Sequence, residues 1–420
     1  MILSNVTVPL LGMVDTAVVG HLDSPHYLGA VAVGATIFNF LYTGLNFLRM
    51  GTTGLAAQAL GQSDHDEIRT ILMQVTGIAL VLGACLLALQ WPIGTAAMAL
   101  INPAPDVATE ARTYFDIRIW SAPAALTNFA LVGWFIGMHN GRAPLIMMII
   151  TNVINIALDF YFVVGLGMTA DGVALASVIA EYSGVTVGFL MVAGILRDHP
   201  GQWLRGHVID ATKMRRLFAV NANLLVRTMA LMFSFGFLTA MSARQGTLIL
   251  AANAILLNLQ YVMSYALDGL ANAAEALVGR AVGSGRPAHL RRAISLPMRW
   301  SAVIAAGLSA LYLIGGWWLI RLLTDLDDVR AAALIYLPWL IVSPIVSVWS
   351  FVYDGVYVGA TLAAEMRNTM LASTFLVFLP AYFLLEPLLG NHGLWLAFLL
   401  FMAARGLTMH WLLPRRLPHP

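Results

Sequence analysis

Charged side chains are scarce in this chain. Only 10% of its 420 residues are Asp, Glu, Lys or Arg, and 60% are hydrophobic. A soluble globular domain has about 25% charged and about 45–50% apolar residues, so this composition excludes a soluble fold. The formal net charge of +2 gives no indication of nucleic-acid binding, and we expect no nucleic-acid partner.

Cysteine and the common catalytic motifs are also missing. Cys85 is the only cysteine, which excludes an internal disulfide and cysteine-based metal clusters. There is no G-x-x-x-x-G-K-[ST] motif for ATP, no serine nucleophile elbow and no H-E-x-x-H zinc motif. We therefore expect neither an enzyme nor a metal cofactor. An ion gradient remains as the source of energy for any active transport.

Long hydrophobic segments, in contrast, fill the chain. A transmembrane helix needs about 20 mainly apolar residues, and the segments of this length do not alternate as the strands of a membrane barrel would. We predict an all-α integral membrane protein with twelve transmembrane helices. The expected spans are about 2–21, 28–49, 68–91, 112–138, 144–166, 172–196, 216–242, 249–272, 293–320, 331–359, 366–389 and 393–413.

The distribution of Lys and Arg predicts the orientation of these spans. Basic residues gather in the loops after the even-numbered spans, most densely from Arg197 to Arg216. By the positive-inside rule, both termini and this loop are cytoplasmic. The sequence starts inside its first apolar span and shows no signal-peptide pattern. We therefore expect that part of the first helix precedes Met1.

The chain also repeats itself. LAAQALGQSD from Leu55 aligns with LVGRAVGSGR from Leu277, and GWFIGMHNGRA from Gly133 aligns with GVYVGATLAAE from Gly355. Both alignments use the same displacement in residue number, which we call the repeat shift. Gly172 aligns with Gly393 at a shift one position shorter.

This repetition predicts the domain organisation. We expect a six-helix N-terminal lobe over 1–200, a cytoplasmic linker over 201–215 and a six-helix C-terminal lobe over 216–420. Duplicated lobes are typical of transporters that work by alternating access.

Two acidic residues stand inside the first lobe. An ionisable group at the centre of a membrane helix costs roughly 2.5–3.5 kcal/mol and usually serves an ion or proton pathway. Asp15 lies in the first apolar span, and Asp159 lies in the fifth with Asn155 on the same helical face. The repeat shift places Phe237 and Ala381 at the corresponding positions, so neither acid is duplicated. We expect the first lobe to handle the coupling ion.

Other buried charges allow two interpretations. Asp268 and Glu275 share a helical face, and with Asp354 they are candidates for a second cation site, the alternative being polar contacts between helices. Arg227 is a candidate counter-charge for an acid. We expect Glu181, Asp116 and Arg118 to form ion pairs between the lobes or at the membrane interface.

Several stretches resemble the multidrug and toxic compound extrusion (MATE) family, in particular its DinF branch. The most specific are SNVTVPLLGMVDTAVVGHLDSPHYLGAVAVGA at 4–35, LRMGTTGLAAQALG, NVINIALDFYFVVGLGM and YALDGLANAAEA. The resemblance implies the MATE fold, with twelve transmembrane helices in two pseudo-symmetric six-helix lobes. It further implies an antiporter that exports cationic or amphipathic drugs in exchange for protons or sodium.

The family's functional residues map onto the first lobe. Asp15 matches the acid of the first helix, Asn155 and Asp159 match the N-x-x-x-D of the fifth, and Ser177 matches a small hydroxyl residue of the sixth. Asn128 in the fourth helix is a weaker candidate for the same polar cluster. The resemblance implies that protonation of this cluster drives substrate release.

Protons are favoured as the coupling ion, because the seventh span, RTMALMFSFGFL, lacks the acid of the sodium-dependent branch. A sodium-coupled antiporter using Asp15, Asn155, Asp159 and Ser177 remains an alternative. A second alternative is a flippase for lipid-linked precursors, although acids in the first lobe favour cationic cargo. We expect a monomer surrounded by membrane lipids in a bacterial inner membrane. The sequence identifies no substrate-binding residues.

Overall fold

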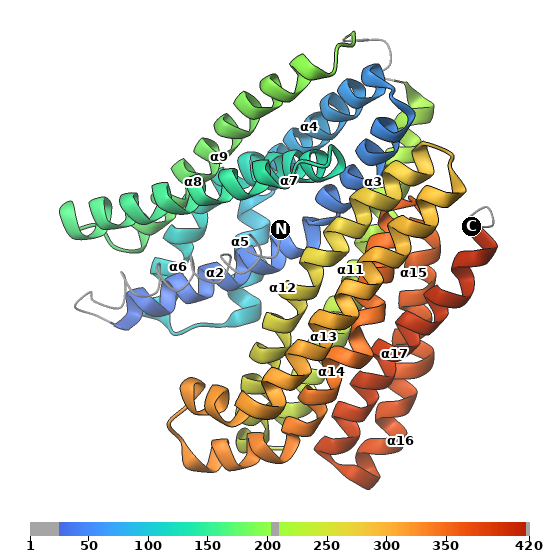
Figure 1. Cartoon of the computed structure of the whole chain (residues 1–420). Helices are drawn as coiled ribbons and strands as arrows, with labels where there is room; N and C mark the ends of the chain where they lie inside the picture. The colour runs from blue at the N-terminus through green and yellow to red at the C-terminus, as the bar shows by residue number, and fades with distance from the viewer. Residues whose placement is uncertain (1–24, 203–209, 417–420) are drawn as a thin grey trace. The chain divides into compact units, whose positions relative to one another are not determined.

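The described part of the chain is built from long helices. The structure is a computed structural model that describes residues 25–202 and 210–416 (Figure 1). Within these ranges, 11 helices are long and apolar enough to cross a membrane. They coincide with the second to twelfth predicted spans and confirm them. The first predicted span and Asp15 lie outside the described residues.

The helices pack into two compact units, and the boundary lies between Leu217 and Phe218. We call the units the first and the second lobe. The boundary falls within one long helix, α11 (Ala211–Arg244), just beyond the expected end of the linker.

The first lobe is divided into many helical elements. Their bounds are α2 (Pro25–Leu45), α3 (Phe47–Gln62), α4 (His65–Ala88), α5 (Gln90–Ile101), α6 (Pro105–Arg118), the 3-10 turn η1 (Ile119–Ser121), α7 (Ala122–Gly137), α8 (Arg142–Asp159) with the π-helical turn η2 (Phe160–Gly165), and α9 (Ala170–Asp198).

The second lobe has fewer interruptions. After α11 it contains α12 (Thr247–Gly283), α13 (Pro287–Leu323), α14 (Asp327–Gly359), α15 (Ala363–Ala372), the π-helical turn η3 (Ser373–Phe378), α16 (Leu379–Leu389) and α17 (Asn391–Arg416).

The two lobes repeat the same helix packing. A Cβ atom on Gly133 of α7 would lie 2.3 Å from the carbonyl oxygen of Arg49 on α3, and a Cβ on Gly355 of α14 would lie 2.3 Å from that of Ala271 on α12. The repeat shift relates both members of each pair. Backbone meets backbone at these crossings because glycine has no side chain.

The backbone turns repeat in the same way. His139 and Thr361, which the repeat shift also relates, both have φ of 57° directly after a close-packed helix. The left-handed region is uncommon for residues other than glycine. Its recurrence at corresponding positions therefore reflects a duplicated architecture.

Two prolines lie next to breaks in the helices of the first lobe. Pro92 follows the break between α4 and α5, whereas the corresponding α13 is continuous. Pro123 follows the 3-10 turn η1, which separates α6 from α7. Proline lacks an N–H group and clashes with the preceding turn, so it kinks a helix. The second kink leaves Arg118 as the last residue of α6.

Candidate functional site

Asp159 occupies a special backbone position in the first lobe. It is the last residue of α8, directly before the π-helical turn η2, and it is 0% exposed. Such π-helical turns are rare and occur frequently at functional sites. Asn155, one turn earlier on the same face, is also buried. This face of α8 therefore carries a buried carboxyl group and a buried amide.

The facing helix α9 adds a hydroxyl group. Asp171 fixes the start of α9, because its Oδ1 accepts hydrogen bonds from the backbone N–H groups of Thr169 and Gly172. Two turns later, Ser177 Oγ accepts a hydrogen bond of 3.3 Å from Asn155 Nδ2. The structure thus brings Asn155 and Ser177 together, and with Asp159, one turn further along α8, we call them the first-lobe cluster.

Arg118 contributes a positive charge to this cluster. Its Nη1 donates a 3.1 Å hydrogen bond to Ser177 Oγ and a second bond to the hydroxyl of Tyr114. The guanidinium lies 5.4 Å from the ring centroid of Phe38 and 5.5 Å from that of Tyr114, within the range of cation–π attraction. Arg118 was expected in an ion pair between lobes or at the membrane interface; the structure places it inside the first lobe.

Asn128 lies beside the cluster and bonds to another acid. Its Nδ2 donates to the carboxylate Oε2 of Glu181 at 2.7 Å and to the Glu181 carbonyl oxygen at 3.1 Å. Glu181 is one turn after Ser177 on α9. Glu181 thus has an amide partner within the first lobe and also interacts electrostatically with Arg118.

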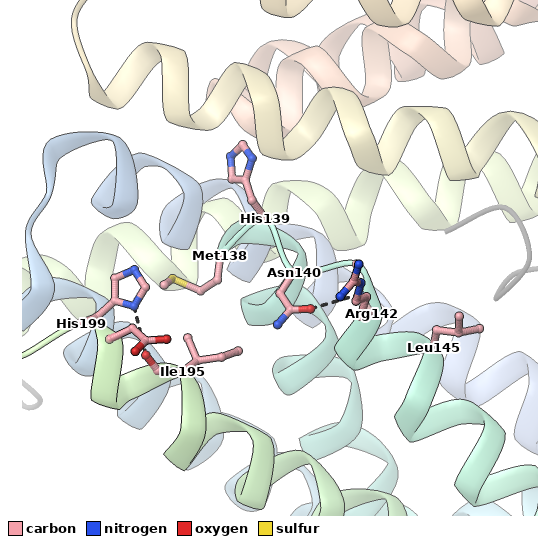
Figure 2. Close-up of a pocket in the computed structure, with 9 residues that line it drawn as sticks. Met138, His139, Asn140, Arg142, Leu145, Ile195 and His199 are labelled. Atoms are coloured by element: carbon pink, nitrogen blue, oxygen red, sulfur yellow. Dashed lines mark hydrogen bonds between the residues drawn. The ribbon is translucent and has the colours of Figure 1, made fainter.

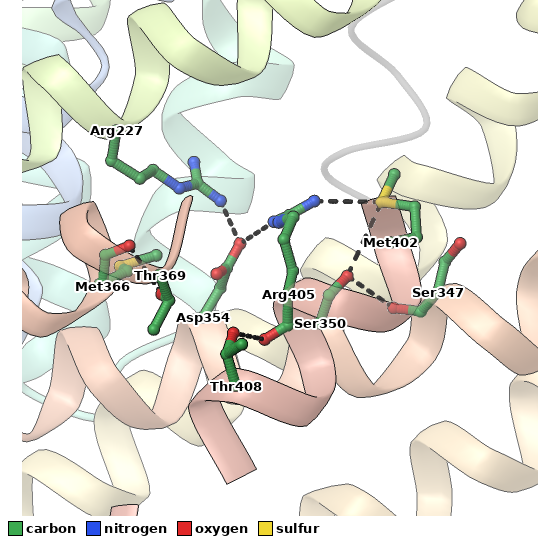
Figure 3. A network of polar contacts seen from close by, with 9 residues as sticks. All are labelled: Arg227, Ser347, Ser350, Asp354, Met366, Thr369, Met402, Arg405 and Thr408. Atoms are coloured by element: carbon green, nitrogen blue, oxygen red, sulfur yellow. Dashed lines mark hydrogen bonds and ion pairs between the residues drawn. The ribbon is translucent and has the colours of Figure 1, made fainter. Parts of the chain in front are cut away.

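The second lobe contains a buried ion-pair network (Figure 3). Asp354 of α14 accepts hydrogen bonds at Oδ2 from Arg227 of α11 and, at 2.8 Å, from Arg405 of α17. All three side chains are buried. Arg227 as a counter-charge for an acid is confirmed. The network ties three helices of the second lobe together.

Of the two interpretations of Asp268, Glu275 and Asp354, these bonds of Asp354 correspond to polar contacts between helices. Asp354 already has two guanidinium partners, and Asp268 of α12 interacts electrostatically with Arg405. Glu275 is buried at the crossing of α12 with α14, where its carbonyl oxygen faces Gly359. In residues 25–202 and 210–416, no group of three or more His, Cys, Asp or Glu side chains is arranged to hold a metal ion.

A separate pocket of about 720 Å³ opens at the other ends of α8 and α9 (Figure 2). His139, Asn140 and Arg142 line it from the turn between α7 and α8, and Asp198 and His199 line it from the end of α9. The 18 residues of α8 correspond to about 27 Å of helix, at 1.5 Å per residue. The pocket and the first-lobe cluster lie at opposite ends of this helix and are distinct sites.

Sequence reasoning missed the roles of Arg118, Glu181 and Arg405. Spacing held part of the signal: Tyr114 and Arg118 are four residues apart on α6, as are Ser177 and Glu181 on α9. Residues at this spacing share a helical face. The helix that each face meets, however, comes from a distant part of the chain.

Comparison with known proteins gives consistent results. The family profile MatE matches residues 1–161 and 224–383. DNA damage-inducible protein F of Escherichia coli (strain K12) is 44% identical over 421 residues, covering 98% of this chain and 90% of that protein. Probable multidrug resistance protein NorM of Bradyrhizobium diazoefficiens is 25% identical over 76% of this chain and 69% of its own length. A crystal structure of MATE in the bent conformation has a TM-score of 0.91 at 16% identity, covering 99% of this chain and 93% of that one, and shows the same fold.

Proposed function

Because this chain belongs to the MatE family of membrane transporters, we propose that it is a proton-coupled multidrug antiporter exporting cationic or amphipathic compounds by alternating access. It is a multi-pass membrane protein and not an enzyme. The similarity to a probable multidrug resistance protein supports drugs as substrates. A bacterial inner membrane with both termini in the cytoplasm is part of the proposal.

The observation that carries the proposal is the complete burial of Asp159 one helical turn from Asn155, which itself bonds to Ser177. A carboxyl group in such a place changes the charge of its surroundings by one unit when it gains or loses a proton. The ionised form attracts a cationic compound, and the protonated form lets it go. Exchange of one proton for one cationic substrate follows from this competition.

The partners of Ser177 support protons over sodium. Its hydroxyl oxygen accepts from two donors, Asn155 Nδ2 and Arg118 Nη1. A sodium ion needs oxygen lone pairs as ligands, and the guanidinium of Arg118 would repel it. A proton needs only the carboxyl oxygen of Asp159. The sodium-coupled alternative would require Arg118 to leave Ser177.

The first experiment uses Asp159→Asn in proteoliposomes with an imposed pH gradient or an imposed sodium gradient. Ethidium and norfloxacin serve as substrates. The wild-type protein should transport both in response to the pH gradient, and Asp159→Asn should lose this transport, because an amide cannot exchange a proton. Asp15→Asn should lose this transport as well, because Asp15 matches the acid in the first helix of the family.

Asp106→Asn is the matched control, since Asp106 is an exposed acid in the first turn of α6. It should transport like the wild type. Unchanged proton-driven transport by a well-expressed Asp159→Asn would refute the coupling role of Asp159. Transport driven by sodium alone would replace the proton proposal with the sodium-coupled alternative, and failure to move either drug would favour a lipid substrate.

A further inference from the structure

Glu181 is an acid within a membrane-spanning helix that the proposed coupling scheme does not use. It lies on α9, half-buried, and its carboxylate is held by the side chain of Asn128 from α7 at 2.7 Å. Four residues separate it from Ser177, which is about 6 Å along the helix at 1.5 Å per residue. Glu181 therefore stands one turn beyond the first-lobe cluster, on the same face of α9.

The partner of Glu181 suits both protonation states. The amide nitrogen of Asn128 donates to the ionised carboxylate. Among the described residues, Asn128 Oδ1 is buried and has no hydrogen-bond partner. A protonated carboxyl group has an O–H donor, and an amide oxygen can accept from it. Rotation of the Asn128 amide therefore lets it bond to either the ionised or the protonated carboxyl group, so Glu181 keeps a hydrogen bond when it gains a proton.

Asp354 in the second lobe has partners that suit only its ionised form. Its two guanidinium partners carry permanent positive charges and have no acceptor atoms. They stabilise the ionised carboxylate and offer nothing to a protonated one. An acid meant for a fixed structural role has such partners, whereas the amide beside Glu181 leaves its charge free to change.

The duplication supplies an internal control for packing. At the shorter shift that aligns Gly172 of α9 with Gly393 of α17, Met402 corresponds to Glu181. Ser350, which the repeat shift relates to Asn128, makes the corresponding contact, with its Oγ 3.9 Å from Met402 Sδ. A side chain without a carboxylate can therefore pack at this position, where Met402 Sδ also accepts a hydrogen bond from Arg405 Nη1.

Polar groups surround Glu181 on several elements packed against α9. Arg118 of α6 and Tyr42 of α2 interact with it electrostatically, and Tyr42 bonds to Ser121 of η1 at 3.0 Å. On α8, Thr151 lies within reach of the same crossing, 2.5 Å from a Cβ placed on Gly184. Tyr114 of α6 and Asp159 of α8 are further titratable groups on these packed helices.

These groups form two facing stripes. Thr151, Asn155 and Asp159 follow one another at spacing four on α8, and Ser177 and Glu181 do so on α9. The hydrogen bond between Asn155 and Ser177 joins the stripes. The stripes place Asn155 and Ser177 on a route between Asp159 and Glu181.

We propose that Glu181 is a second proton-binding carboxyl group of the first lobe, exchanging its proton with Asp159 along this route. The inference rests on the proposed function and adds a residue to it. In each exchange the O–H bond of one carboxyl group breaks and that of the other forms, with hydroxyl groups and water as carriers. Orientation by the positive-inside rule places Glu181 one turn closer to the cytoplasm than Ser177.

Infrared difference spectroscopy of the full-length protein in lipid tests this directly. Spectra recorded at acidic minus alkaline pH should contain carbonyl bands of protonated carboxyl groups. Glu181→Gln should lose one buried component, and Asp159→Asn should lose a different one. Glu181→Met, which installs the residue of the second lobe, should fold and lose the same component as Glu181→Gln. Retention of every component in both Glu181 variants would overturn the proposal.

Proton release on ethidium binding separates this inference from the proposed function. Glu181→Gln should bind ethidium, measured by equilibrium dialysis, but release fewer protons, with a flatter dependence of transport on pH. If Glu181→Gln releases as many protons as the wild type and Asp159→Asn does not, the role of Glu181 is refuted and the proposed coupling by Asp159 stands. Wild-type release by both variants would refute the proposed coupling itself.

Asn128→Ala keeps the inference testable should the Glu181 variants fail to fold. Glu181 remains present in that variant, but the amide that stabilises both of its forms is gone. The pH midpoint of the Glu181 band should move. An unmoved midpoint would overturn the proposal.

Discussion

At the scale of single residues, the partners of a buried acid decide what it can do. Asp159 lies one turn from the amide of Asn155 on the same helix, Glu181 bonds to an amide, and Asp354 bonds to two arginines. All three appear in the sequence as acids within apolar segments. The fold distinguishes them by the partners that it places around each carboxyl group.

The network around Asp354 leads to a prediction about stability. Asp354→Leu leaves Arg227 and Arg405 buried beside each other, and removing one partner of a buried ion pair costs about 3–5 kcal/mol. Arg227→Met should cost less, because Asp354 keeps its bond to Arg405. Thermal unfolding of the purified variants in detergent should give the lowest midpoint for Asp354→Leu.

Asp325→Asn provides the control for this series. Asp325 is fully exposed in its pair with Arg330, and exposed ion pairs contribute about 0–1 kcal/mol. Its unfolding midpoint should stay close to that of the wild type. Equal losses for Asp354→Leu and Arg227→Met would show that the charge balance of the network is not what stabilises the second lobe.

The candidate site could be predicted as far as its parts share one helix. Asn155 and Asp159 follow from their spacing, and the resemblance added Ser177. Arg118 contacts Ser177 across 59 residues and Arg405 contacts Asp354 across 51. No periodicity in the sequence encodes such contacts, because they depend on which helix faces meet.

At the scale of helices, glycines set the closest crossings. A Cβ on Gly355 would lie 2.3 Å from the carbonyl oxygen of Ala271, and one on Gly359 would lie 2.4 Å from that of Glu275. Both neighbours are backbone atoms within α12 and cannot rotate away. Small residues that let helices approach closely are typical of membrane proteins.

Gly355→Ala should therefore push α12 and α14 apart. We expect a loss of about 1–3 kcal/mol, as for other overpacked sites. Gly307→Ala in α13 is the matched control, because a Cβ there meets nothing within 4 Å. Alanine favours a helix over glycine by about 1 kcal/mol, so this variant should be at least as stable as the wild type. Thermal unfolding measures both; a stable Gly355→Ala would contradict the crossing.

Helix ends were harder to predict than helix positions. The second span was expected over 28–49, but its helix continues through α3 to Gln62, and the eighth continues to Gly283 rather than ending at 272. Hydrophobicity marks the part of a helix inside the membrane. Alanine-rich segments such as LAAQALGQ continue the helix beyond it, because alanine has the highest helix propensity.

At the scale of the whole chain, each lobe carries polar groups that the other lacks. The shorter shift aligns Gly172 with Gly393. At this shift, the residues that correspond to Arg118, Ser177 and Glu181 are Trp339, Phe398 and Met402. Conversely, the repeat shift relates Asp354 of the second lobe to the apolar Val132 of the first. The duplicated framework is therefore common to both lobes, while the first-lobe cluster and the ion-pair network belong to one lobe each.

The predicted orientation can be tested with cysteine labelling. Replacing Cys85 by Ser removes the native thiol, and Gln202 and Asp325, both exposed, are then changed to Cys one at a time. A membrane-impermeant maleimide added to intact cells should label Asp325→Cys and spare Gln202→Cys. Inverted vesicles should show the reverse. Labelling of Gln202→Cys from outside would overturn the cytoplasmic position of the loop between the lobes.

The paired glycine crossings finally bear on the ancestry of the chain. Contacts present in both halves, such as Gly133 on Arg49 and Gly355 on Ala271, date from the single six-helix ancestor. Contacts present in one half were gained by that half or lost from the other after the gene was copied. The shared crossings are thus the part of the ancestor that both descendants keep, whereas the acids and arginines of the two lobes have diverged since.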